Sequence, residues 1–265
     1  MSIAARNAIL AEGGGQPSGG YWGLCFTAEE PNCVVNMARK GALTNINKAP
    51  VTLEYSTDDC ETWTAFDATG EKTTPISLAN IGDHVFFRAG EGGNDRFAYN
   101  ISAYRYFTFT GNVAASGNIM SLLDASNQSN HSLSGHSEFA LACLFRNCTS
   151  LTAAPSLPAT TLANSCYNQM FSGCTSLTTA PALPATTLED SCYNRMFSGC
   201  ELLNEITAGI ITWTPSSGSA ATTDWLNGVA ATGTFRCPTA LGTNATITRG
   251  VSACPEGWTV INTDA

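Results

Sequence analysis

A block of 26 residues occurs twice in succession in the second half of the chain, and it constrains the fold more than any other feature. The first copy reads FRNCTSLTAAPSLPATTLANSCYNQM, the second reads FSGCTSLTTAPALPATTLEDSCYNRM, and a third starts with FSGCELL and then diverges. Self-similarity at a period of about 20–50 residues predicts a solenoid of stacked units. Three residue types keep the 26-residue step, at Phe145, Phe171 and Phe197, at Cys148, Cys174 and Cys200, and at Leu151, Leu177 and Leu203.

The interior of one copy predicts a short helix followed by an extended segment. Apolar residues recur at i, i+4 and i+8 across 162–171, which is the pattern of an amphipathic helix. The threonines at 160–161 supply an N-cap, and Gly173 supplies a left-handed C-terminal position. The residues 174–184 alternate in polarity before two prolines, which indicates a short strand, or rung. A helix and a rung in each copy predict a leucine-rich-repeat unit, stabilised by packing against its neighbours.

The repeated phrase CYxxMFxGCTSLTxAPxLPATTL and the later tail TTDWLNGVAATGTF…PEGWTV resemble the BspA-like branch of the leucine-rich-repeat proteins. The resemblance covers residues 117–260, roughly the second half of the chain. It implies a surface-exposed or secreted binding protein of a host-associated microbe. Similar modules are also carried by phages of gut bacteria. The resemblance is therefore equally compatible with a virion protein.

Composition narrows the classes of partner. Charged residues make up 12% of the 265, the net charge is −9, and no basic cluster occurs, which argues against nucleic-acid binding. The apolar run 8–11 is shorter than the about 7–15 residues of a secretory signal, and no stretch approaches the ~20 apolar residues of a membrane span. With the resemblance, we expect a virion or extracellular surface location without a signal peptide.

The first half of the chain predicts an antiparallel β-sandwich of immunoglobulin-like type across 21–110, with Trp63 in its core. Short alternating segments separated by turn residues are typical of such folds. A capping helix at 117–126 and a repeat domain at 111–265 with a strand-rich tail complete the predicted organisation. The candidate strands are 21–28, 33–38, 51–57, 62–66, 74–78, 84–89 and 104–110.

The first twenty residues predict an anchor on a tether. Residues 2–11 form a candidate short helix, and the Gly-rich segment 12–20 has the composition of a flexible linker. Ile3, Ile9 and Leu10 are the candidate contacts with another virion or surface protein. A frayed terminus is the alternative.

Cysteine usage predicts buried free thiols in the repeats. Stacked cysteines at equivalent positions act as small apolar residues, which favours buried thiols over a zinc site. We expect no cofactor and no metal. The sequence does not decide whether Cys237 and Cys254 form a disulfide. The chain has eleven cysteines, and those of the repeat region are Cys143, Cys148, Cys166, Cys174, Cys192 and Cys200.

Three groups of residues offer other chemistry, and each has a simpler explanation. The carboxylates of Asp58, Asp59 and Glu61 are compatible with a calcium site or with a solvated turn. The loop histidines His131 and His136 lie near Asp124 in sequence without a nucleophile motif. A carbohydrate-active enzyme requires two placed carboxylates. The repeat region offers Glu189, Asp190, Glu201 and Glu205.

These observations predict a non-enzymatic binding or adhesion module that contacts a bacterial surface glycan or protein. The predicted contact surface is the outward side of the rungs, with Thr152 and Thr178 in register beside Ala154 and Ala180. The second hypothesis is a structural or decoration protein of a phage particle, docked through its N-terminal segment, with homo-oligomers possible. A carbohydrate-active enzyme is a distant third.

Overall fold

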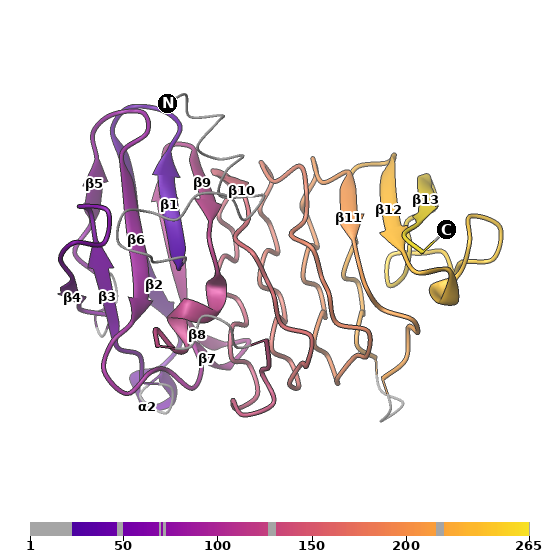
Figure 1. Ribbon diagram of the computed structural model, residues 1–265, viewed down its shortest axis with the longest axis horizontal. Helices are drawn as coiled ribbons and strands as arrows, with labels where there is room; N and C mark the ends of the chain where they lie inside the picture. The colour runs from indigo at the N-terminus through magenta and orange to yellow at the C-terminus, as the bar shows by residue number, and fades with distance from the viewer. Residues whose placement is uncertain are drawn as a thin grey trace.

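The computed structural model describes residues 23–46, 50–68, 70, 73–126, 131–215 and 220–264. Within these residues the chain is mostly β, with antiparallel sheets and a small parallel sheet (Figure 1). Its described helical segments are the four-residue α2 (Leu43–Ile46) and the 3-10 turns η1 (Ile119–Leu122) and η2 (Thr239–Leu241). The expectation of an α/β repeat region is therefore wrong. The candidate anchor residues Ile3, Ile9 and Leu10 and the linker 12–20 lie outside the described residues.

Two sheets form the first half of the described chain, and all seven predicted strands are confirmed. The larger has the order β10-β9-β1-β6-β3-β4 and the smaller the order β5-β2-β8-β7. The strands of the larger sheet are β1 (Leu24–Ala28), β3 (Leu53–Ser56), β4 (Thr64–Phe66), β6 (His84–Ala89), β9 (Val113–Ser116) and β10 (Leu151–Ala153). Those of the smaller are β2 (Cys33–Lys40), β5 (Ile76–Leu78), β7 (Ala98–Asn100) and β8 (Ala103–Thr110).

The two sheets pack face to face through aromatic side chains. The ring of Phe26 in β1 lies 4.8 Å from that of Phe107 in β8, and Phe87 in β6 lies 5.2 Å from Phe107, both in edge contact. Such edge-to-face pairs add to the burial of apolar surface. Trp63 is not in this core, contrary to expectation. It is half-buried on the outer side of the larger sheet, with the Arg88 guanidinium 4.0 Å above its ring.

Both sheets continue directly into the repeat region. In the larger sheet, β9 pairs in parallel with β10, which belongs to the first repeat. In the smaller, Phe107 of β8 donates its N–H to the carbonyl of Leu144 at 2.9 Å. One hydrophobic core also runs from Leu24 to Val260. The sheets of the first half therefore cover the N-terminal end of the repeat stack.

The predicted helix at 162–171 is a column of tight turns. Its backbone N–H groups alternate between two kinds of acceptor. Met170 donates to Tyr167 three residues back at 3.1 Å, whereas Gln169 and Phe171 donate to Asn194 and Met196 in the next repeat at 2.8 and 2.9 Å. An α-helix would direct all of these groups to its own carbonyls four residues back. Left-handed residues recur every four positions, at Ser165, Gln169 and Gly173.

Equivalent side chains stack from one repeat to the next, as the period predicts. The rings of Phe145 and Phe171 are 5.3 Å apart and nearly parallel, and those of Phe171 and Phe197 are 5.5 Å apart. These three rings are fully buried. The leucines that keep the same step are fully buried too, at Leu151, Leu177 and Leu203.

The last part of the chain adds the predicted final strands. The strands β11 (Glu205–Thr207), β12 (Gly233–Cys237) and β13 (Trp258–Asn262) form a parallel sheet in that order (Figure 1). Trp225 and Trp258 are buried in this part of the chain, and residues 223–228 form turns. All eleven cysteines are free thiols, which confirms the prediction for the repeats and rejects a Cys237–Cys254 disulfide.

Candidate functional site

The outward side of the rungs, here called the rung face, is the surface that the sequence predicted to bind. It runs from residues 178–179 across β11, β12 and β13. A backbone bridge joins Thr179 to Glu205, and the strand register then aligns Glu205 with Thr234 and Thr259. Adjacent strands lie about 4.8 Å apart, so the face is a closely spaced row. Its exposed or half-buried members are Thr178, Thr179, Glu205, Thr207, Thr234, Arg236, Thr259 and Ile261.

The four residues predicted for this surface differ in their exposure to solvent. Thr178 is exposed to solvent. Thr152, in register one repeat earlier, is half-buried, and its hydroxyl lies 2.8 Å from the Glu29 carboxylate and 3.2 Å from the Val113 carbonyl. Ala154 is half-buried against the core, and Ala180 is buried. Of the four, Thr178 is therefore the one that presents its side chain freely.

Sequence reasoning missed most of the rung face. The step between aligned residues is 26 from Thr179 to Glu205, but it is 29 from Glu205 to Thr234 and 25 from Thr234 to Thr259. A fixed period therefore cannot place the later members. The alternation of TGTFRC, with Thr234 and Arg236 on one side of the strand, is the signal that could have found them. Across the strands, Arg236 Nε lies 3.2 Å from Glu205 Oε1 and fixes the centre of the face.

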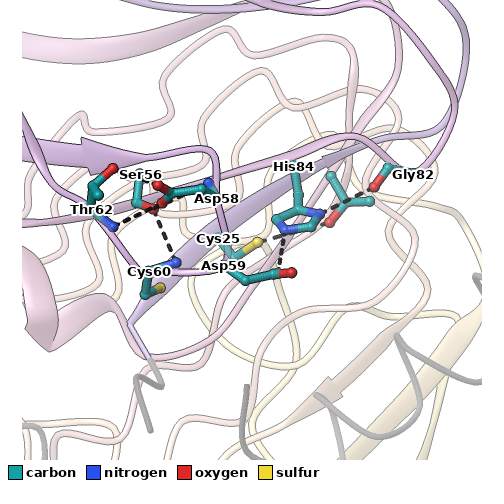
Figure 2. Close-up of polar contacts among 9 residues, drawn as sticks. Cys25, Ser56, Asp58, Asp59, Cys60, Thr62, Gly82 and His84 are labelled. Carbon is teal, nitrogen blue, oxygen red and sulfur yellow. Dashed lines mark hydrogen bonds and ion pairs between the residues drawn. The ribbon is translucent and has the colours of Figure 1, made fainter. Parts of the chain in front are cut away.

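A second polar cluster lies on the turn between β3 and β4. Figure 2 shows Asp58 pointing back towards Ser56 and Thr62, which donate to its two carboxylate oxygens; Ser56 Oγ lies 2.6 Å from Oδ1, and Thr62 Oγ1 lies 2.5 Å from Oδ2. These hydrogen bonds, that from Ser56 first, lower the pKa of Asp58 to about 2. The carboxylate thus serves to close its own turn.

His84 and two cysteines lie beside this turn, but their arrangement does not activate a nucleophile. His84 Nε2 lies 2.8 Å from Asp59 Oδ1, and Nδ1 lies 3.2 Å from the Gly82 carbonyl, so both ring nitrogens face acceptors (Figure 2). Burial raises the pKa of the Cys25 thiol to about 12, and that of Cys60 to about 12. A nucleophilic cysteine requires the opposite shift.

The carboxylates considered for hydrolysis do not share a pocket in the described structure. Glu189 and Glu201 are exposed, and Glu205 is paired with Arg236. A groove of about 780 Å³ lies elsewhere, at the end of β6, and none of these residues lines it.

The two loop histidines, His131 and His136, make different contacts. His136 and Asp124 both line the groove at the end of β6, and both Ser126 N–H and Ser126 Oγ donate to Asp124 Oδ1. His131 contributes its carbonyl, which accepts from the backbone N–H of Thr160 at 2.8 Å. None of these contacts joins a histidine ring to a nucleophile.

Within the described ranges, no group of three or more His, Cys, Asp or Glu side chains is placed to hold a metal ion. The turn carboxylates of Asp58 and Asp59 are engaged as described above, with Ser56 and Thr62 and with His84. Of the helices in the part of the chain that the structure describes, none is long and apolar enough to cross a membrane.

Comparison of the chain with protein-family models, with curated proteins and with solved structures finds no match.

Proposed function

We propose that the protein is a non-enzymatic binding or adhesion module, displayed on a virion or cell surface, that contacts a bacterial surface glycan or protein through the rung face. The observation that carries the proposal is the continuous row of accessible hydroxyl and charged side chains from Thr178 to Thr259. In this proposal the repeats form a short leucine-rich-repeat solenoid of the BspA-like kind, preceded by an immunoglobulin-like sandwich.

The chemistry of the rung face suits an extended, uncharged partner. Threonine hydroxyls donate and accept hydrogen bonds, and their methyl groups add small apolar contacts. The Glu205–Arg236 pair at the centre provides both a carboxylate and a guanidinium, which bind vicinal hydroxyl groups or backbone amides. Individual contacts of this kind are weak, so affinity depends on their number and on the rigidity of the strands that hold them.

The test replaces Thr178 and Thr234 with arginine in one variant. Both side chains lie on the rung face, so we expect an unchanged melting temperature and loss of binding to intact bacterial cells. Thr186→Arg is the control, because Thr186 is also exposed, belongs to the same repeat as Thr178 and lies outside the rung face. Binding that the double variant retains in full would contradict the proposal.

The second candidate, a decoration protein docked through its N-terminal segment, makes a different prediction. Wild-type protein would then bind no cells or purified surface glycans, whereas deletion of residues 1–12 would prevent its incorporation into particles. The sequence observation that supports this second candidate is the predicted linker at 12–20, with five glycines among nine residues.

A further inference from the structure

The last rung, β13, is an edge strand of the parallel sheet. An edge strand presents backbone N–H and C=O groups that are a template for pairing with another chain. Thr263 donates to the carbonyl of Cys237 in β12 at 3.0 Å. Since backbone groups alternate in direction along a strand, Trp258 and Val260 direct theirs to the opposite side, away from β12. These groups define the free edge of the stack.

Two side chains from the preceding loop occupy this edge. Asn244 accepts a hydrogen bond from the Val260 N–H through Oδ1 at 3.2 Å. Arg249 Nη1 donates to the Trp258 carbonyl at 2.7 Å. The N–H of Trp258 is also taken, by the carbonyl of Pro255 at 3.2 Å. A strand added to this edge would bond the same backbone groups, so the loop occupies the place of another rung.

The two side chains also hold each other, and together they are called the edge clamp. Arg249 Nη2 donates to Asn244 Oδ1 at 2.9 Å, while Nη1 further contacts the Pro255 carbonyl at 2.9 Å and Cys254 Sγ at 3.2 Å. A guanidinium carries five N–H donors in a fixed plane, so one side chain can satisfy several acceptors at once. Arg249 is half-buried, which keeps the plane in position.

The opposite end of the stack is closed by the sheets of the first half, where β9 pairs with β10. A second copy therefore has no open rung to offer at that end of its stack, whereas its own β13 offers the same edge and the same backbone groups. We propose that the edge clamp is an autoinhibitory contact that prevents two copies of this chain from pairing through β13. Such a pair would be antiparallel about a two-fold axis, because each copy offers the same edge.

The test removes the edge clamp by substitution and measures the mass of the protein in solution. Arg249→Met keeps the aliphatic bulk but removes the donors, and Asn244→Ala removes the acceptor for Val260. By sedimentation and light scattering, both variants should reach about twice the wild-type mass as concentration rises. Arg195→Met is the matched control, because that guanidinium pairs with Asp224 on the turn column, away from β13. It should keep the wild-type mass.

A second substitution separates edge pairing from aggregation of unfolded chains. Ile261 lies on β13 and is 41% exposed, so Ile261→Lys is tolerated and places like charges next to each other in a β13 pair. Added to Arg249→Met, it should restore the wild-type mass. Association that persists in this double variant would overturn the proposal. So would folded clamp variants, verified by circular dichroism, that keep the wild-type mass. If Arg249→Met does not fold, Asn244→Ala decides between the two outcomes.

Discussion

The thiol of Cys174 donates a hydrogen bond of 3.1 Å to the carbonyl of Phe145, one repeat earlier in the chain. Cys200 makes the same contact with Phe171, also at 3.1 Å. Each thiol is fully buried and satisfies a carbonyl of the neighbouring repeat. The 26-residue step of cysteine follows from this contact, because a small side chain with a weak donor is required at each position.

Burial of these thiols predicts their reactivity. We expect iodoacetamide to leave Cys174 and Cys200 unlabelled in native protein and to react first with half-buried Cys60. Burial raises the pKa of Cys60 to about 12, so thiolate is scarce at neutral pH and its alkylation rate should rise about tenfold per pH unit from 7 to 9. Mass analysis of peptides measures this. Labelled Cys174 in folded protein, or a disulfide between repeats, would contradict it.

Truncation of a stacked leucine should be costly. Leu177 is fully buried between equivalent leucines, so Leu177→Ala should lower the free energy of unfolding by about 2–5 kcal/mol. Urea unfolding at neutral pH measures the loss. Leu202→Ala is the control, because Leu202 is 55% exposed and its truncation should change stability little. Equal losses for the two variants would show that Leu177 is not confined by its neighbours.

The left-handed glycine that ends the turn column at 165–173 should not tolerate a side chain. Gly173 has φ +79°, and a Cβ there would lie 2.5 Å from Asn147 Oδ1. Gly173→Ala should therefore cost about 1–2 kcal/mol from the left-handed conformation alone. Gly135→Ala is the comparison, since a Cβ there meets no atom within 4 Å. The prediction fails if thermal unfolding gives both variants the wild-type melting temperature.

The Asp58 turn predicts an acid-sensitive contribution to stability. A carboxyl whose pKa falls to about 2 in the folded state stabilises the fold fully above its unfolded pKa of ~3.9. That contribution is lost as the pH falls through about 2. Asp58→Asn should therefore lower the free energy of unfolding at pH 7. It should also reduce the difference between the free energies of unfolding at pH 5 and pH 2, as measured by urea unfolding at each pH. Glu61→Gln, an exposed carboxylate of the same turn, is the control.

Part of the candidate site was predictable and part was not. Thr178 was found from the repeat because its position follows the 26-residue step. The later members Thr234 and Thr259 were not, because the length of the connection between rungs changes to 29 and then 25 residues while the strand pairing continues. Pairing depends on backbone geometry in space, so a rung can stay aligned when the sequence period is lost.

The amino-acid sequence alone is enough to predict the stack. Residues at the 26-residue step must meet equivalent residues, so the ladders of Phe171, Cys174 and Leu177 follow from the period alone. It could not distinguish a helix from a column of turns, because apolar residues at i, i+4 and i+8 fit both over so short a segment. The tertiary structure decided this: Gln169 and Phe171 donate their N–H groups to the next repeat, and those acceptors exist only when the neighbouring repeat is in place.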